Sequence, residues 1–155
     1  MGKILAAGIF LVDASNRILI CHPTNHPVDV WSIPKGKVEK DETELDAALR
    51  ETYEETNIDL TLVDKVIELD IQIYSHKKKA LKPYVVFEIK NPSIDFKSFD
   101  LKCNSNVPKE RGGFPEMDGY LFCTLQKARK LLHPTQVACL DAIEELIEKI
   151  KDGLN

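Results

Sequence analysis

Long apolar runs and paired cysteines are both absent from this sequence. The four cysteines lie far apart and form no Cys-x-x-Cys pair, which disfavours a zinc site and a compact disulfide framework. No apolar stretch approaches the roughly 20 residues that a helix needs to cross a bilayer. We therefore expect a cytoplasmic protein with reduced thiols and no membrane association.

An excess of basic charge and two common catalytic signatures are also missing. The chain carries 21 Lys and Arg residues against 25 Asp and Glu residues, which argues against a general nucleic-acid-binding surface. It contains neither a Gly-x-Ser-x-Gly nucleophile elbow nor a Gly-x-x-x-x-Gly-Lys-Ser/Thr phosphate loop. At 155 residues it is long enough for one well-buried core, and we expect a single domain over residues 1–155.

The hydrophobic pattern alternates between strands and helices, which is typical of an α/β fold. Residues 4–12 and 17–21 form a predicted hairpin, and further strands are expected around residues 59–74, 84–89, 96–101 and 120–124. Helices are predicted at residues 125–132 and from Pro134 onward. The last helix carries an apolar stripe at helical spacing, made of Leu140, Ile143, Ile147 and Ile150. This order predicts a mixed sheet between helices, an α/β/α arrangement.

The segment with the clearest chemistry runs over residues 36–58 and contains a predicted helix with one acidic side. At about 100° per residue, Glu51, Glu54 and Glu55 share one side of this helix, because they stand three and four residues apart. Like charges at these separations destabilise an exposed helix by roughly 0.2–0.5 kcal/mol per pair, and Arg50 alone cannot neutralise them all. The spacing therefore favours a divalent cation at this side, and a cation points to phosphate chemistry.

The same helix has a less polar side and a recognisable beginning. The less polar side is expected to pack against the rest of the domain and consists of Leu45, Ala48, Leu49, Thr52 and Thr56. Asp41 with Glu44 three residues later forms a capping box, which places the helix start near Glu42 or Thr43. A solvated helix face is the alternative interpretation of the glutamates, since glutamate is also an ordinary helix former.

Residues 36–58 resemble the box that defines the Nudix hydrolases. That box reads Gly, five residues of any kind, Glu, seven of any kind, then Arg-Glu-aliphatic-x-Glu-Glu-x-Gly-aliphatic. The matching positions hold Gly36, Glu42, Arg50, Glu51, Glu54 and Glu55. Thr52 replaces the aliphatic residue, and its hydroxyl is able to bond a carbonyl one turn back. Asn57 replaces the closing glycine, and asparagine tolerates a left-handed helix end better than most residues.

The resemblance implies a Nudix-type α/β/α sandwich that hydrolyses a pyrophosphate linkage with Mg²⁺, with Mn²⁺ as a possible substitute. It implies metal ligation by Glu51, Glu54 and Glu55, with the main-chain carbonyl of Gly36 as a further ligand. Glu51, Glu54 and Arg50 are accordingly catalytic candidates. Arg50 is expected to hold Glu51 by a charge-assisted hydrogen bond rather than to touch substrate.

A general base is also needed, and the resemblance leaves two sources for it: a glutamate of the box or an acid from a later loop. Glu116 and Asp118 fit the second description, and Glu116 is the catalytic candidate of the two. The alternative is that both acids only form a polar turn before the strand that follows. Glu39 and Glu42 are further acids near the box, suited to an outer metal shell or a second metal site.

The substrate is expected to be a nucleoside polyphosphate, bound as a small molecule. Residues 114–118, with Arg129 and Gln136, resemble a MutT-like subgroup described as nucleoside triphosphate pyrophosphohydrolases. The lead-in Trp-x-x-Pro-Lys-Gly at residues 31–36 resembles that of diadenosine tetraphosphate hydrolases. A diadenosine polyphosphate hydrolase is therefore one alternative, and a sensor that binds a nucleotide without turnover is another. The sequence favours no particular oligomeric state.

Three residues are predicted to bind the substrate: Lys35, Tyr84 and Glu39. Lys35 is placed to contact a phosphate outside the metal shell, and Tyr84 to stack on a base. A turn lysine exposed to solvent is the simpler interpretation of Lys35. A core aromatic is the simpler interpretation of Tyr84, because aromatic residues at strand spacing pack on sheets.

Overall fold

The computed structural model describes residues 4–71, 73–74 and 79–153, which form a mixed sheet around strand β1 (Ile4–Val12). The strand order is β4-β6-β1-β2-β7, while β3 also pairs with β1 and β5 with β6. Strands β1 and β6 run parallel, and the other pairs are antiparallel. The remaining strands are β2 (Ile18–Pro23), β3 (Lys35–Lys37), β4 (Ile67–Glu68), β5 (Ile73–Tyr74), β6 (Ala80–Phe87) and β7 (Met117–Cys123).

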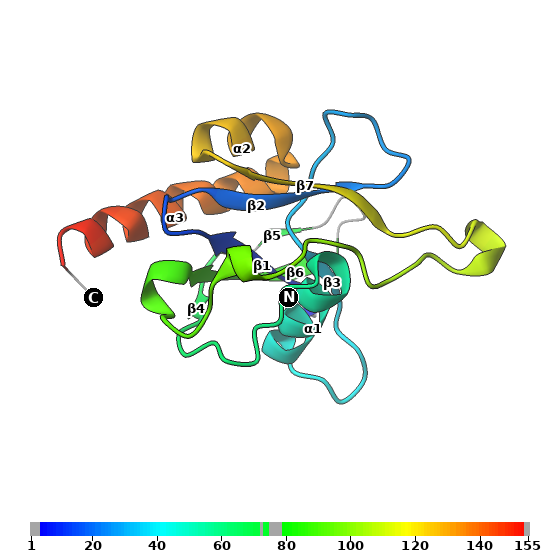
Figure 1. The fold of residues 1–155 in the computed structure, drawn as a ribbon, viewed down its shortest axis with the longest axis horizontal. Helices are drawn as coiled ribbons and strands as arrows, with labels where there is room; N and C mark the ends of the chain where they lie inside the picture. Colours follow the sequence, from blue (N-terminus) through cyan, green and yellow to red (C-terminus); the bar gives the residue numbers. More distant parts are fainter. Residues whose placement is uncertain (1–3, 72, 75–78, 154–155) are drawn as a thin grey trace.

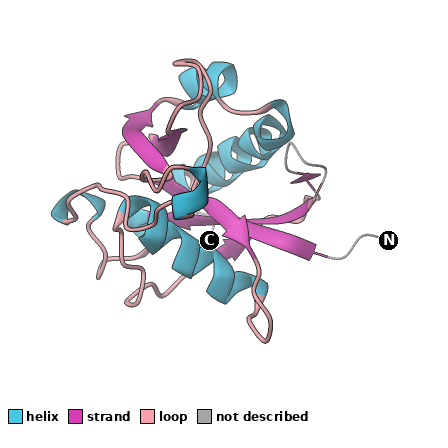
Figure 2. Cartoon of the chain, turned by 90° about the vertical axis from the view of Figure 1, so that its right-hand side faces the viewer, coloured by secondary structure: helices cyan, strands magenta, loops and turns pink. Residues whose placement is uncertain are grey.

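Helices cover both faces of this sheet (Figure 1). Helix α1 (Glu44–Thr56) lies on one face, and α2 (Leu125–Leu131) and α3 (Pro134–Lys151) lie on the other. Figure 2 shows the same layers from the side, with the strands between the helices. The predicted α/β/α arrangement with a mixed sheet is confirmed. None of the described helices is long and apolar enough to cross a membrane.

Strand β1 supplies side chains to two separate apolar cores, because successive residues of a strand point to opposite faces of the sheet. Ile9 and Leu11 pack in the cluster on the α1 side. Phe10 and Val12 pack in the cluster on the α2 and α3 side. Burial on both faces accounts for the continuous apolar sequence of this strand. The predicted hairpin with β2 is present, with Val12 opposite Ile18.

Two of the strand predictions fail in part. The strand expected at residues 96–101 is replaced by a single 3-10 turn, η2 (Phe96–Ser98), because the Asp95 carboxylate accepts a hydrogen bond from the main chain of Lys97 and bends the chain. Residues 59–74 hold only the two short strands β4 and β5. Two further 3-10 turns are η1 (Glu88–Lys90) and η3 (Lys109–Arg111).

Helix α1 begins at Glu44, with Thr43 as its N-cap. The Thr43 hydroxyl accepts a hydrogen bond from a main-chain N–H of the first turn at 3.0 Å. The predicted capping box of Asp41 and Glu44 is therefore wrong. Asp41 instead has a left-handed backbone, with φ of 64°. Glu42 consequently lies before the helix, where its carboxylate faces Arg50.

Candidate active site

Strand β3 brings the main chain of Gly36 against the carboxylate of Glu51. Gly36 lies opposite Ala7 in the pairing of β3 with β1. A Cβ atom on residue 36 would stand 2.0 Å from Cδ of Glu51, far inside van der Waals contact. Only glycine leaves room for this carboxylate, so the first residue of the box has a packing role.

Arg50 gathers the acids of the box around its guanidinium group. Its Nε donates to Glu42 at 2.8 Å, its Nη1 to Glu51 at 2.9 Å and Glu54 at 3.2 Å, and its Nη2 to the Lys37 carbonyl at 2.9 Å. The predicted hydrogen bond to Glu51 is present. The bond to Arg50 also lowers the pKa of Glu42. Because its donors are occupied by protein groups, Arg50 orients the acids rather than reaching outward.

Two acids of the box are held where negative charge is disfavoured. Glu55 is only 3% exposed and accepts a hydrogen bond from the N–H of Lys35 at 3.0 Å. Burial raises the pKa of Glu55 well above its usual range, and the charge of Glu51 adds to the rise. Burial also raises the pKa of Glu51 to about 7, against the lowering effect of Arg50. These carboxylates would gain stability from a nearby positive charge.

The two departures from the box pattern fit the structure as expected. The Thr52 hydroxyl donates to the carbonyl of Ala48, one turn back, at 2.8 Å. Asn57 ends the helix in the left-handed conformation, with φ of 71°. Both predictions are confirmed, and neither side chain displaces an acid of the box.

The carboxyl end of α1 is closed by residues that the sequence pattern did not indicate. Its last four carbonyl groups all accept hydrogen bonds. The Tyr53 carbonyl accepts from the main-chain N–H of Asn57 and from the side-chain amide of Asn104. The Glu54 carbonyl accepts from the main-chain N–H of Asn104, and the Thr56 carbonyl from that of Lys102. The Glu55 carbonyl accepts from the Tyr120 hydroxyl. Asn104 and Tyr120 lie far from the box in sequence, so helical spacing gives no sign of them.

The structure separates the two acids that were candidates for the general base. The Asp118 carboxylate lies 2.6 Å from Nδ1 of His22, which gives it a partner on the neighbouring strand β2. The charge of Glu116 adds to the raised pKa of both Glu51 and Glu55, after the larger effect of burial. Glu116 therefore acts electrostatically on the acids of the box, while the Asp118 carboxylate is engaged by His22.

The three predicted substrate-binding residues fall in different environments. Tyr84 is 7% exposed and packs in the core cluster on the α1 side, so its ring has no free face for a base. We correct that prediction, because β6 is buried along almost its whole length. Lys35 lies beside Glu55 and is partly exposed. Glu39 is largely exposed and lies 3.7 Å from Arg50.

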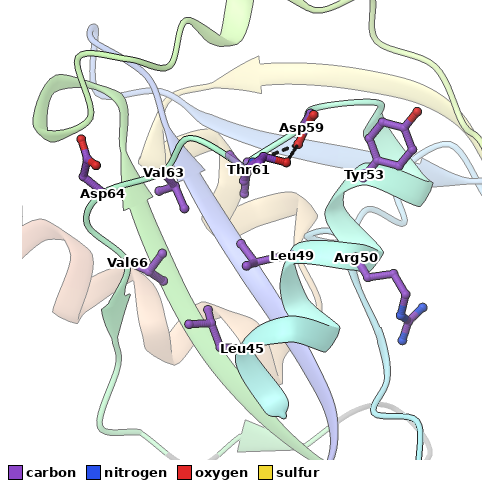
Figure 3. Close-up of a pocket in the computed structure, with 10 residues that line it drawn as sticks. Leu45, Leu49, Arg50, Tyr53, Asp59, Thr61, Val63, Asp64 and Val66 are labelled. Carbon is purple, nitrogen blue, oxygen red and sulfur yellow. Dashed lines mark hydrogen bonds between the residues drawn. The ribbon is translucent and has the colours of Figure 1, made fainter. Parts of the chain in front are cut away.

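The other flank of α1 borders a surface pocket of about 620 Å³ (Figure 3). Leu45 and Leu49 are partly buried and pack against the core cluster on the α1 side, as expected for the less polar side of the helix. They also line this pocket, opposite Val63 and Val66. Arg50 borders the pocket, but its guanidinium group points away from it. None of the glutamates of the box lines the pocket, so it is separate from the acidic cluster.

The acidic cluster has the donor chemistry of a divalent cation site. Among the residues that the structure describes, no three acidic, histidine or cysteine side chains already converge at metal-binding distances. Glu51 and Glu54 instead share one nitrogen of Arg50. Carboxylate oxygens are the ligands that hard cations prefer, and burial raises the pKa of Glu51 and Glu55, so a positive charge beside them would stabilise their ionised forms. The residues present therefore fit such an ion.

Residues 2–138 match the family model described as NUDIX domain. The chain therefore belongs to the Nudix family. Members of this family bind nucleotide substrates.

Known proteins resemble the chain over parts of its sequence and over its whole fold. Dihydroneopterin triphosphate diphosphatase of Escherichia coli K12 is 36% identical over 76 residues, which are 46% of this chain and 50% of that protein. The chain spans half or less of the curated relatives that it matches.

Two solved structures share the fold at low sequence identity. A Caenorhabditis elegans Ap4A hydrolase binary complex is 22% identical with a TM-score of 0.67, covering 92% of this chain and 98% of that one. A MutT protein from Methanosarcina mazei Go1 is 18% identical with a TM-score of 0.61, covering 96% and 97%. The expected resemblance to both groups is confirmed at the level of the fold.

Proposed function

We propose that this protein is a divalent-cation-dependent hydrolase of a nucleoside polyphosphate, with a nucleoside triphosphate as the leading substrate. The observation that carries the proposal is the acidic cluster itself. Arg50 holds Glu51 and Glu54 together, Glu55 lies on the buried side of the same helix, and Glu116 adds a carboxylate from the later loop. A protein that only binds nucleotides has no need of every one of these acids.

Glu51, Glu54 and Glu55 would hold the cation, with the Gly36 carbonyl as a further oxygen ligand. When bound, the cation supplies positive charge that stabilises the phosphoryl oxygens and the leaving group in the transition state. Glu54 is the most exposed of the three carboxylates, with its side chain 35% exposed, so it lies nearest to solvent and to an incoming phosphate.

The remaining steps belong to the protein's own side chains. Glu116 takes a proton from the water that attacks phosphorus, so that the new bond forms to a stronger nucleophile. Arg50 keeps Glu51 and Glu54 in position through the reaction. Lys35, which is partly exposed beside the cluster, contacts a phosphate of the substrate. The products are a nucleotide and a second phosphate-containing fragment.

Two kinds of substrate have support. The likeness to dihydroneopterin triphosphate diphosphatase favours a triphosphate, and the MutT-like residues 114–118 favour a nucleoside triphosphate among the triphosphates. The lead-in at residues 31–36 and the fold shared with an Ap4A hydrolase favour a diadenosine polyphosphate as the second candidate.

A product screen tests the proposal. Nucleoside triphosphates, diadenosine polyphosphates, nucleotide sugars and 5′-triphosphate RNA are each incubated with the protein and Mg²⁺ or Mn²⁺, and the products are identified by chromatography. We expect product in large excess over protein, and none when the divalent ion is omitted. Saturable binding with every ligand recovered intact would overturn the proposal in favour of a nucleotide sensor.

A further inference from the structure

A short piece of the long loop before β7, residues 102–105, is fastened to the end of helix α1. The main-chain N–H of Asn104 donates to the Glu54 carbonyl at 2.6 Å. The side-chain amide of Asn104 donates to the Tyr53 carbonyl at 3.1 Å and to Oδ1 of Asn57 at 2.9 Å. Figure 1 shows the segment before β7 passing over this end of the helix. One asparagine thus makes three bonds to the last turn of α1.

The next residue of the same loop is fastened to Glu116. The N–H of Glu116 donates to the Ser105 carbonyl at 3.0 Å, and the Glu116 carbonyl accepts from Thr24 N at 3.0 Å. Both polar groups of the Glu116 main chain are therefore bonded. The path from Glu54 through Asn104 and Ser105 to Glu116 crosses only two hydrogen bonds and one peptide link.

We infer that Asn104 is a positioning residue that sets where the Glu116 carboxylate stands relative to the metal carboxylates of α1. This inference rests on the proposed function, in which Glu116 is the general base. The loop is paired with itself between these two points, through the bonds of Glu116 N to the Ser105 carbonyl and of Val107 N to the Phe114 carbonyl, so a shift at Asn104 is passed on to Glu116. Displacing a catalytic group by about 1 Å can lower turnover by about 100-fold.

A plain structural role for Asn104 makes a different prediction. An asparagine that only caps the helix would lower the melting temperature when replaced, without a specific effect on turnover. A positioning role lowers kcat while KM changes little, because the base acts mainly in the transition state. A positioning role also requires that the loss of kcat largely disappear when Glu116 has already been replaced. The two roles are thus separable by kinetics.

The experiment is a double-mutant cycle of Asn104→Ala and Glu116→Gln, assayed by product formation on the best substrate of the screen. We expect Asn104→Ala to lower kcat about tenfold with KM within about twofold. In the Glu116→Gln background the same change should lower kcat by less than about twofold, since the group it positions is already gone. Asn106→Ala is the matched control, because Asn106 is an exposed asparagine of the same loop and its side chain makes no hydrogen bond in the described structure.

A second variant covers the case in which Asn104→Ala does not fold. Asn104→Asp keeps the shape of the side chain and removes both N–H donors, and the same loss of kcat is expected from it. If Glu116→Gln loses activity but both Asn104 variants keep wild-type kcat, the inference fails and the proposed function stands. Equal losses from Asn104→Ala in both backgrounds would also overturn the inference. If Glu116→Gln itself keeps wild-type kcat, the base assignment fails and the inference falls with it.

Discussion

The two flanks of helix α1 differ in how their side chains are held. On one flank, hydrogen bonds from Arg50 fix Glu51 and Glu54, and strand β3 packs against Glu51. On the other, Leu45 and Leu49 line an open pocket without any acid of the box. Both flanks reach the surface, so exposure does not mark the site. The site is marked instead by carboxylates that are partly buried and held in place by hydrogen bonds.

The largest effect is expected on the acidic flank. Glu54→Gln keeps the size and helix propensity of the side chain but removes a charge that the cation needs, so turnover should fall by about 100-fold or more. The fold should survive, because Arg50 keeps its bonds to Glu42 and Glu51 and one like-charge repulsion on the helix disappears. Tyr53→Phe is the matched control, since Tyr53 is the preceding residue and lines the pocket. Equal turnover in the two variants would contradict the assignment of catalysis to the acidic flank.

A smaller loss is expected where strand β3 meets the acidic flank. Gly36→Ala places a methyl group on the Glu51 carboxylate, so we expect kcat to fall about tenfold or more and stability to fall by about 1–3 kcal/mol. Lys37→Ala serves as control, because the Lys37 side chain is exposed and only its main-chain carbonyl binds Arg50. Steady-state kinetics and thermal unfolding measure the two effects. Unchanged kinetics in Gly36→Ala would show that the Glu51 position is not critical.

The apolar flank should respond in the opposite way. Leu49→Ala removes part of a half-buried side chain, which should lower the free energy of unfolding by about 1 kcal/mol. Turnover should stay within about twofold of the wild type, because no glutamate of the box lines the pocket that Leu49 borders. Chemical denaturation together with the kinetic assay checks both statements. A loss of turnover comparable to that of Glu54→Gln would make the pocket part of the active site.

The smallest effect concerns His22, which pairs with the acid left outside the cluster. Its Nδ1 lies 2.6 Å from Asp118 and its Nε2 3.0 Å from the Pro27 carbonyl, and both nitrogens donate only in the protonated ring. The hydrogen bond to Asp118 raises the pKa of His22, against the effect of burial. A raised pKa means that this stabilisation is complete below about pH 6.5 and is lost as pH rises through the folded-state pKa.

Thermal unfolding between pH 6 and 9 measures this contribution. We expect the wild type to lose stability with rising pH more steeply than His22→Gln over that range. Asp118→Asn should remove the same pH dependence and leave turnover within about twofold. Identical pH profiles for all three proteins would show that the pair does not titrate with folding. A large kinetic loss in Asp118→Asn would place Asp118 in the catalytic cluster after all.

The sequence predicted those parts of the site that depend on local spacing. Arg50 and Glu51 are adjacent on one helix, and the Thr52 hydroxyl and the Asn57 helix end act within one turn, so helical geometry alone places them. The same reasoning placed the central hairpin and the two C-terminal helices, because their apolar periodicity is strong.

Features set by tertiary contacts were out of reach. Tyr84 was expected at the substrate, but β6 is covered on both faces, and alternation within a strand cannot reveal that. The bonds of Asn104 and Tyr120 to α1 join residues about 50 or more positions apart, which leave no local pattern. The capping box at Asp41 was equally ambiguous, because Thr43 offers a competing N-cap two residues later.

Direct measurement of metal binding tests the central claim, that the acidic flank of α1 holds the divalent cation used in hydrolysis. Isothermal titration with Mn²⁺ is carried out on the wild type, Glu54→Gln and Tyr53→Phe, without substrate. The wild type and Tyr53→Phe should bind the ion with equal affinity, and Glu54→Gln should bind it at least about tenfold more weakly. Equal affinity in all three proteins would contradict the account.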